Sequence, residues 1–195
     1  MHTQLETWKG KFGKEYTDRN EISWRDRLPV FKTILNGLAL NSVLEVGCNR
    51  GHNLTALIHL LGDECDIVGV EPNEYAASLA RREDLAVFDR DIYDLPFEDG
   101  EFDLVFTAGV LIHIPPDNLS DGLHEIYRVS NNYILAIEYF SEEETCIHYR
   151  GNDDLLWKRD FPKIYMETFP DLMLLRYGIA ATPSKVCWWL WRKGK

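Results

Sequence analysis

One short stretch of this chain, a glycine-containing turn between an apolar run and a helical segment, limits its possible folds more than any other. From Val43 to Gly51 the sequence reads VLEVGCNRG, and a helical pattern begins near Asn53. Gly47 frees the backbone for a tight turn, and Gly51 lets a ligand approach the backbone closely. Such a turn between a strand and a helix is typical of the nucleotide-binding crevice of a doubly wound sheet.

The spacing of the glycines separates this turn from two common phosphate-binding loops. The pattern is E-x-G-x-x-x-G, whereas dinucleotide-binding proteins carry G-x-G-x-x-G. No Gly-Lys-Ser/Thr follows, which argues against a P-loop. A glycine at a strand–helix turn can also serve packing alone, so the residues around the turn must decide its role.

Composition and charge indicate a soluble globular protein with a small-molecule partner. The 195 residues fit a single domain, 1–195, with a substantial core. The net charge of −11 argues against a nucleic-acid partner, whose phosphates would be repelled, but allows a small anionic substrate. No apolar run approaches the roughly 18 residues of a membrane span. The polar segment 1–20 predicts no signal peptide, and we expect a cytoplasmic monomer or homodimer.

The cysteines indicate neither a metal site nor a disulfide framework. Cys48, Cys65, Cys146 and Cys187 are far apart and form no C-x-x-C pair. Reduced thiols of a cytosolic protein are the simplest interpretation, and we expect no bound metal.

Strands and helices alternate along the chain, which predicts a mainly parallel sheet with helices on both faces. The expected strands are 42–46, 66–70, 86–89, 102–107 and 132–139, and the expected helices are 22–38, 53–61, 73–82 and 117–129. Strands 172–179 and 185–192 should form an antiparallel hairpin with its turn at 181–184. The predicted fold class is therefore α/β, a doubly wound seven-stranded sheet. We expect residues 1–40 to form a helical arm or lid and residues 141–170 a substrate-side insertion.

The carboxyl ends of these strands carry the groups that an adenosyl ligand needs. Glu71 follows the glycine turn by about twenty residues, where a carboxylate can accept both ribose hydroxyls. Asp91 can accept the adenine amino group, with Ile92 covering the ring. The full set of cofactor-binding residues expected at the strand ends is Glu45, Gly47, Cys48, Asn49, Gly51, Glu71, Pro72, Asp91, Ile92, Gly109 and Val110.

Each of these residues also has a purely structural interpretation. Glu71 can cap the helix that begins at Asn73, and Asp91 can be a turn residue before Leu95. A nicotinamide cofactor is the main alternative ligand, since Glu71 would serve its ribose equally well, although the glycine spacing argues against a pyrophosphate turn. Because the ends of the first four predicted strands all carry suitable groups, we favour an adenosyl ligand over a nicotinamide cofactor.

The glycine turn, read with DGEFDLVF at residues 99–106, resembles the motifs of class I S-adenosylmethionine-dependent methyltransferases. The resemblance implies a Rossmann-like fold, S-adenosylmethionine as the cofactor and S-adenosylhomocysteine as the product. Glu45 would then lie near the positive ammonium and sulfonium groups, where its negative charge is favourable.

Two further stretches resemble a narrower group, the methyltransferases associated with pseudaminic acid biosynthesis. They are WKGKFGKEYTDRN at residues 8–20, and IEYFS at 137–141 followed by YRGNDDLLWKRDF at 149–161. The family implies O- or N-methylation of a nonulosonic acid or nucleotide-activated sugar, that is, sugar modification in surface-glycan biosynthesis. Two alternatives stay open: a methyltransferase of an amino-acid or natural-product metabolite, and a non-catalytic S-adenosylmethionine-binding protein.

The first stretch places aromatic and basic side chains at helical spacing. Phe12, Tyr16 and Arg19 can share one face of a helix. We expect Arg19, with its planar fork of donors, and Tyr16 to bind the carboxylate of the cofactor's methionine part. The alternative is a helix packed on the sheet with Arg19 in solvent.

The second stretch follows the fifth strand and should reach over the crevice. Tyr149, Arg150, Lys158 and Arg159 supply local positive charge in an acidic protein, which would suit a carboxylated or phosphorylated sugar. We therefore expect them to bind the substrate. The alternative is a solvated helix with weak surface ion pairs.

His113, just past the fourth strand, is the first candidate for a general base. Its ordinary pKa near 6.5 allows it to accept a proton at neutral pH. Glu138 and Tyr139, at the end of the fifth strand, are the next candidates, followed by His148. The alternative for His113 is that it only packs or orients its loop.

Overall fold

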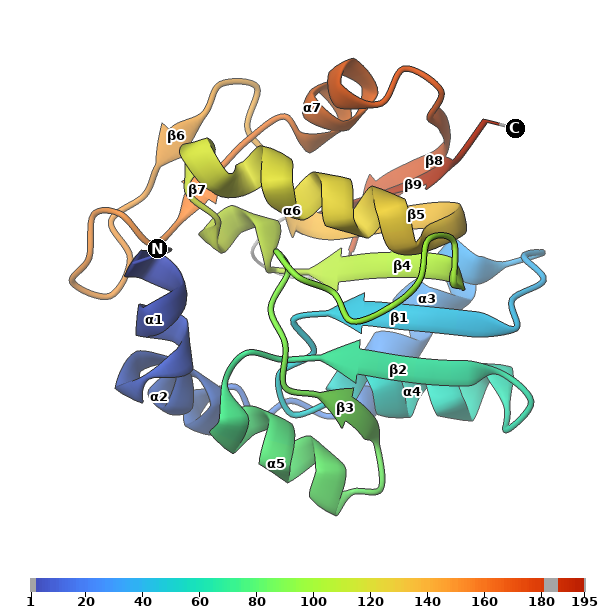
Figure 1. The fold of residues 1–195 in the computed structure, drawn as a ribbon, viewed down its shortest axis with the longest axis horizontal. Helices are drawn as coiled ribbons and strands as arrows, with labels where there is room; N and C mark the ends of the chain where they lie inside the picture. The colour runs from blue at the N-terminus through green and yellow to red at the C-terminus, as the bar shows by residue number, and fades with distance from the viewer. Residues whose placement is uncertain (1–2, 181–185, 195) are drawn as a thin grey trace.

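The computed structural model describes residues 3–180 and 186–194 and has a seven-stranded sheet at its centre (Figure 1). The strands are β1 (Ser42–Val46), β2 (Asp66–Val70), β3 (Ala86–Phe88), β4 (Phe102–Ala108), β5 (Ser130–Tyr139), β8 (Met173–Ile179) and β9 (Val186–Arg192). Their order across the sheet is β3-β2-β1-β4-β5-β9-β8. Neighbours are parallel except where β9 pairs with β5 and β8. The predicted α/β class and terminal antiparallel hairpin strands are confirmed.

Helices and a small second sheet complete the described chain. The helices are α1 (Thr3–Lys9), α2 (Lys11–Arg19), η1 (Trp24–Arg27), α3 (Leu28–Leu35), α4 (His52–Leu61), α5 (Glu74–Arg82), η2 (Leu111–His113), α6 (Pro116–Val129) and α7 (Phe161–Thr168). The short strands β6 (Thr145–Cys146) and β7 (Trp157–Lys158) pair antiparallel inside the predicted insertion. No helix in the described ranges is both long and apolar enough to span a bilayer.

The central strand β4 is buried on both faces, as its nearly continuous apolar run predicts, whereas the edge strand β8 exposes alternate side chains. Successive side chains of a strand point to opposite faces. Val105 accordingly joins the core under α6 and α7, whereas Leu104 and Phe106 join the core under α3, α4 and α5. Each of these three side chains is 0% exposed. Truncating one of them to alanine would cost about 2–5 kcal/mol of folding stability.

The predicted helix at 22–38 was wrong in its extent. It is two elements, a 3₁₀ turn followed by α3, which ends at Leu35. Pro29 at the start of α3 favours a new helix there, because it cannot donate a backbone hydrogen bond. Gly37 with φ +75° takes the chain out of the helix. The predicted turn at 181–184 lies outside the described residues.

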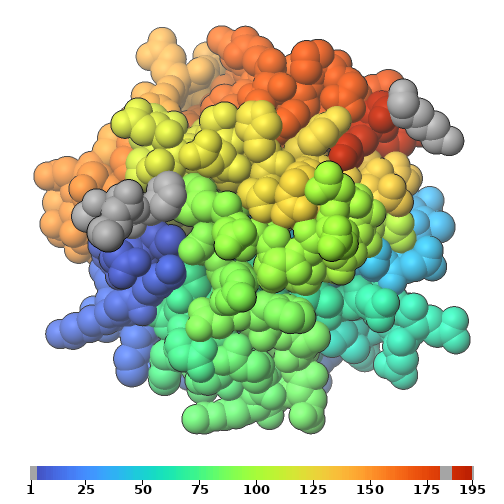
Figure 2. All heavy atoms as spheres, viewed as in Figure 1, coloured from blue at the N-terminus to red at the C-terminus, as the bar shows by residue number. Residues whose placement is uncertain are grey.

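The carboxyl ends of the parallel strands all point to the same side of the molecule, the left of Figure 1. Helices α1 and α2 lie on this side, and so does the segment with β6 and β7. The space-filling view shows both on that same side (Figure 2). Two regions distant in sequence therefore meet over the edge of the sheet where ligands of such folds bind.

Candidate active site

A cavity opens where β1, β2 and β4 end, with the N-terminal helices on its other side. Its lining includes Trp8, Tyr16, Arg27, Glu45, Gly47, Cys48, Asn49, His52, Asn53, Glu71, Pro72, Asp91, Ile92, Tyr93, Gly109, Val110 and His113. Every residue predicted to bind the cofactor lines it except Arg19 and Gly51. The predicted strand-end residues other than Gly51 thus lie together at the cavity, and their binding of a cofactor stays a prediction.

The glycine turn is closed by bonds from β2 and by crowding from β4. The N–H groups of Gly47 and Cys48 donate to the carbonyl of Val70, at 2.8 and 3.0 Å. Gly47 has φ +78°, and a Cβ there would lie 2.5 Å from Cγ2 of Val110. Both the backbone angle and the space therefore require glycine at this position.

Gly51 does not have the role that its place in the motif predicts. It does not line the cavity, and a Cβ there would lie 2.3 Å from Cδ1 of Leu85. With φ +82° it also begins α4. Gly51 therefore serves the turn and its packing, and the prediction that it admits a ligand was wrong.

Glu71 holds two loops together at the cavity. Its carboxylate accepts the N–H of Asn49 at 2.8 Å and of Asn73 at 2.9 Å. The cap of α5 is the side chain of Asn73, which accepts the N–H of Ala76, so Glu71 is not itself the helix cap. Each carboxylate oxygen can accept a second bond, which leaves acceptor capacity for a ligand. Burial raises the pKa of Glu71 to about 7.

Four buried polar atoms of the described residues that line the cavity have no hydrogen-bond partner. They are Oε2 of Glu45, Nε of Arg27, Nε2 of His52 and Nε1 of Trp8. Glu45 is 1% exposed, and its other oxygen accepts from Asn53 at 2.6 Å. Burial raises the pKa of Glu45 to about 8, against the opposing effect of the Arg27 charge. A carboxylate beside a guanidinium suits a ligand that carries both an ammonium and a carboxylate group.

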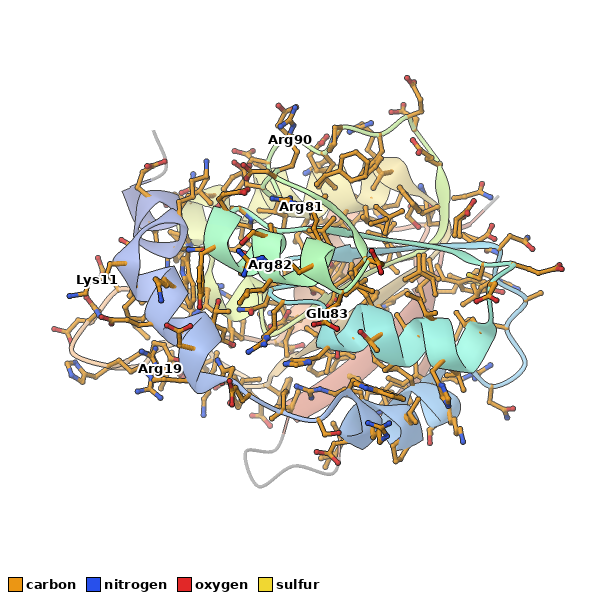
Figure 3. The ribbon with its side chains drawn as sticks, turned by 90° about the horizontal axis from the view of Figure 1, so that it is seen from below. Lys11, Arg19, Arg81, Arg82, Glu83 and Arg90 are labelled. Carbon is orange, nitrogen blue, oxygen red and sulfur yellow. The ribbon has the colours of Figure 1, made fainter. Side chains whose placement is uncertain are left out.

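Arg19 does not line the cavity. It lies 3.9 Å from Glu15 and above the ring of Phe12, on the outer side of α2 (Figure 3). The buried side of α2 carries Thr17, and Arg19 lies about 200° further round the helix at 100° per residue. Arg27 of η1 lines the cavity instead. The sequence offers no pattern that separates Arg27 from its neighbour Arg25.

The orientation of His113 is fixed by a backbone carbonyl. Its Nδ1 lies 2.6 Å from the oxygen of Leu155, and a carbonyl can only accept, so Nδ1 carries the hydrogen. Nε2 is then the ring nitrogen with a free lone pair. Burial lowers the pKa of His113 to about 4. The ring is therefore neutral at pH 7, but it is a weaker base than the ordinary histidine assumed from sequence.

His113 belongs to an aromatic cluster, which we define as Trp8, Phe12, Tyr16, His113 and Tyr149. The Trp8 ring lies 4.4 Å from that of His113, 5.1 Å from Phe12 and 5.2 Å from Tyr16, between centroids. Tyr149 lies 5.5 Å from His113 and 6.2 Å from Phe12. Burial, and then the neighbouring Tyr149 and Tyr139, raise the pKa of Tyr16 to about 12. The cluster joins the N-terminal arm to the insertion.

Asn73 attaches the arm to the glycine-turn side of the cavity. Its side-chain amide lies 2.8, 3.1 and 3.2 Å from the carbonyls of Trp8, Lys9 and Gly10, at the end of α1. Lys9 also pairs with Asp91 at 3.4 Å. The arm therefore rests on the two loops that carry Glu71 and Asp91, and nothing in the sequence of the arm predicts this attachment.

Two predicted catalytic residues lie outside the cavity. Glu138 is 0% exposed, and its carboxylate accepts the N–H groups of Val110, Leu111 and Ile112 at 3.0, 3.1 and 3.4 Å. Tyr139 packs against the core, with Lys158 above its ring. The prediction of Glu138 as a direct base does not fit this geometry, because its carboxylate is engaged by backbone donors.

The predicted cationic substrate patch is not formed as expected. Arg159 is 1% exposed and donates to Glu144 and to two backbone carbonyls. Arg150 stacks on Tyr149, and Lys158 lies over Tyr139. None of the three lines the cavity, and His148 instead pairs with Asp153. The prediction that Arg159 meets an anionic substrate was wrong, because its charge is used inside the protein.

Comparison with known sequences gives a match over the middle of the chain. Residues 43–132 match a family model described as a methyltransferase domain. An uncharacterized protein of Haemophilus influenzae is 33% identical over 95 residues, which is 45% of this chain. The matched region is 37% of that relative's length, so the relative is much longer than the segment they share.

Solved structures resemble the whole chain. A 1,6-didemethyltoxoflavin-N1-methyltransferase from Burkholderia thailandensis, with bound S-adenosylhomocysteine, has a TM-score of 0.74 at 18% identity, over 100% of this chain and 90% of its own. This chain has the class I methyltransferase fold. The magnesium protoporphyrin IX methyltransferase of Synechocystis PCC 6803, with bound S-adenosylmethionine, gives 0.70 at 12% identity, over 97% and 95%. The [4+2]-cyclase SpnF gives 0.66 at 15%, over 90% and 85%.

The class I fold accounts for the position of the cavity, and the two methyltransferase structures hold the cofactor expected from the sequence or its demethylated product. The matched segment 43–132 spans β1 to the start of β5 and so includes Glu45, Glu71 and His113. The arm with Trp8 and Arg27 and the insertion with Arg159 lie outside it. The family match therefore covers the strand-end side of the cavity but neither the arm nor the insertion.

Proposed function

We propose that this protein is an S-adenosylmethionine-dependent methyltransferase that acts on an oxygen or nitrogen atom of a small molecule. The observation that carries the proposal is the set of unpartnered buried atoms of Glu45, Arg27 and His52 in a cavity that Glu71 also lines. A zwitterionic amino-acid group fits the first three residues, and a ribose fits Glu71. The methyltransferase fold and family match support the same ligand.

Each group of cavity residues has a distinct task in this proposal. Glu71 accepts the ribose hydroxyls, while Asp91 and Ile92 meet the adenine. Arg27 binds the carboxylate of the methionine part, and Glu45 faces its ammonium. The bound cofactor supplies an activated methyl group, so the protein contributes mainly position. Tyr16, from the N-terminal arm, covers the methionine part of the cofactor.

His113 is the proposed contact of the acceptor. Its Nε2 lone pair accepts a hydrogen bond from the acceptor O–H or N–H and directs that atom toward the cofactor side. The ring takes up the proton as the new bond forms, and its low pKa means that the proton passes on readily to solvent. The aromatic cluster shields this position from water.

For the substrate we propose a nonulosonic acid or nucleotide-activated sugar. The support is the resemblance of residues 8–20 and 149–161 to methyltransferases associated with pseudaminic acid biosynthesis. Arg150 and Lys158 of the insertion would meet the substrate's carboxylate or phosphate. We treat 1–195 as one domain with an arm at 1–40 and an insertion at 141–170. The wide spacing of the four cysteines, with no C-x-x-C pair, fits a cytoplasmic enzyme.

A methyl-transfer assay tests the proposal together with calorimetric binding. Labelled S-adenosylmethionine is offered with nonulosonic acids, their cytidylyl forms, other sugars, amino acids and heteroaromatic metabolites. Binding with transfer to a sugar supports both parts of the proposal. Transfer only to another class overturns the substrate class, and absence of cofactor binding by folded protein overturns the function.

The second candidate is a protein that binds the adenosyl cofactor and transfers no methyl group. Two observations favour it: the low pKa of His113, which weakens a base, and the occurrence of the fold in a [4+2]-cyclase. Micromolar binding of S-adenosylmethionine without transfer to any compound of the panel would support this candidate.

A further inference from the structure

We propose that Arg159 and Glu138 are positioning residues that hold the turn carrying His113 from its two ends. The inference rests on the proposed function, because it assigns His113 the acceptor contact. The turn comprises Val110–Ile114 and contains the short helix η2. Neither charged residue lines the cavity, so each acts on the reaction only through the turn.

Glu138 satisfies the first end of the turn. The first N–H groups of a helical turn have no partner within the turn itself. One oxygen of Glu138 accepts from Val110 and Leu111, at 3.0 and 3.1 Å, and the other accepts from Ile112 at 3.4 Å. Because Glu138 is the penultimate residue of β5, it ties the turn to the central sheet.

Arg159 satisfies the opposite end. Its Nη1 donates to the carbonyl of Leu111 at 3.1 Å, and its Nη2 donates to the carbonyl of Ile114 at 2.9 Å. Its Nε donates to Glu144 at 2.6 Å, which fixes the guanidinium plane. The two charges also have the signs that a helical turn favours, negative where it begins and positive where it ends.

The backbone around Arg159 adds a third attachment. The carbonyl of Leu155 binds Nδ1 of His113 at 2.6 Å, four residues before Arg159. The carbonyl of Arg159 accepts the N–H of Ser141 at 3.2 Å, which joins the segment after β7 to the residues that follow β5. One segment therefore sets both the backbone and the ring direction of His113. This gives Arg159 an orienting role rather than a charged contact with substrate.

Arg128 provides a matched control inside the same protein. Its Nε donates to Glu125 at 2.7 Å, and its two Nη atoms donate to the carbonyls of Phe97 and Leu95 at 2.7 and 3.0 Å. Like Arg159, it thus joins one glutamate to two backbone carbonyls, and it also donates to Asp99 and to the second oxygen of Glu125. The segment that it holds does not carry His113. A general effect of losing an arginine that binds two backbone carbonyls should therefore appear in variants of both Arg128 and Arg159.

The test compares Arg159→Lys, Glu138→Gln and Arg128→Lys. We measure melting temperature, Kd for S-adenosylmethionine, kcat and KM for the acceptor, and the imidazole NMR signals of His113. A lysine is a point donor and lacks the fixed fork that reaches both carbonyls. We expect Arg159→Lys to lower kcat about 10–100-fold, since small misplacement of a reacting group has effects of that size. Its Kd should change less than about twofold, and the His113 signals should shift.

Glu138→Gln keeps one acceptor oxygen and should give a smaller loss of kcat, with shifted His113 signals. Arg128→Lys should leave kcat and the His113 signals unchanged at a similar loss of melting temperature. Unchanged His113 signals and kcat in Arg159→Lys would overturn the inference, as would an equal kcat loss in Arg128→Lys. If Arg159→Lys does not fold, Glu138→Gln decides by the same criteria.

The NMR signals separate this inference from the proposed function. If the wild-type protein transfers no methyl group, the proposed function fails, but shifted His113 signals in Arg159→Lys still support the clamp on the turn. If transfer occurs and the signals do not respond, the clamp fails and the function stands.

Discussion

The two sides of the cavity are built in different ways. On the glycine-turn side, Glu45 binds Asn53, 8 residues away, and Glu71 binds Asn49 and Asn73, 22 and 2 residues away. In the aromatic cluster, His113 binds Leu155, 42 residues away, and packs on Trp8 from the arm. The first side is held by neighbours inside one βαβ unit, whereas the second exists only after the arm and insertion have docked.

This difference implies that the two sides can be disturbed separately. Changes on the glycine-turn side should act on cofactor affinity, and changes in the aromatic cluster should act on transfer. Residues that connect the sides should affect both.

His113→Ala should lower kcat by about 100-fold or more, because it removes the acceptor's hydrogen-bond partner. Kd for S-adenosylmethionine should stay within about twofold. His124→Ala, on the exposed face of α6, is the control and should change neither. Between pH 5 and 8, kcat should show no inflection from His113, because burial places its pKa at about 4. Steady-state kinetics across this range checks the loss of kcat and its pH dependence. A loss of cofactor affinity equal to the loss of kcat would contradict the separation of the two sides of the cavity.

Asn73→Ala should affect both sides, because Asn73 links the arm to the Glu71 loop. Loss of the amide leaves the carbonyls of Trp8, Lys9 and Gly10 without this donor, at a cost of about 1–3 kcal/mol. We expect faster proteolysis within residues 3–20 and a several-fold rise in Kd. Lys11→Ala, an exposed change in the same arm, is the control. Proteolysis at the wild-type rate would show that the arm is held elsewhere.

The pH dependence of stability should give the smallest effect. Burial raises the pKa of Glu45 to about 8 and of Glu71 and Glu138 to about 7, above the ordinary 4.5. Between pH 4.5 and 8 the unfolded chain therefore binds fewer protons at these groups, so their contribution to stability decreases as pH rises. Chemical denaturation at pH 5, 6, 7 and 8 measures this slope. Glu138→Gln should flatten it, and an unchanged slope would contradict the assignment of Glu138.

Cofactor binding should have the opposite pH dependence. A cationic ligand beside Glu45 favours the ionised carboxylate, so Kd should decrease as pH rises from 6 to 8 and binding should release protons. Calorimetry in two buffers of different ionisation enthalpy detects that release.

The sequence predicted the glycine-turn side well because its determinants are local. Strands 42–46 and 66–70 and the strand-end residues Glu45, Glu71 and Asp91 follow from apolar runs that stop at polar groups. The errors concern residues whose role depends on tertiary contacts. Arg159 carries a charge that a sequence pattern assigns to the surface, and only the folded chain brings the carbonyls of Leu111 and Ile114 to it.

Arg19 and Glu138 were misplaced for related reasons. Helical spacing gives the relative directions of Phe12, Tyr16 and Arg19 but not which of them faces the cavity. The end of β5 was correctly expected near the site. Whether Glu138 meets a ligand or backbone amides depends on the turn that follows β4, which supplies the N–H groups of Val110 and Leu111. Arg27 was not predicted as a cavity residue, because it lies in a 3₁₀ turn where the sequence predicted a regular helix.

Calorimetric titration of S-adenosylmethionine into the wild type, Arg27→Met and Arg19→Met tests the central claim most directly. The two variants remove the same charge, but only Arg27 lines the cavity with an unpartnered nitrogen. The account predicts micromolar binding by the wild type, a loss of about 10–100-fold in Arg27→Met, as for a hydrogen bond between charged groups, and no change in Arg19→Met. Binding that weakens in Arg19→Met and not in Arg27→Met, or no binding to folded wild type, would contradict it.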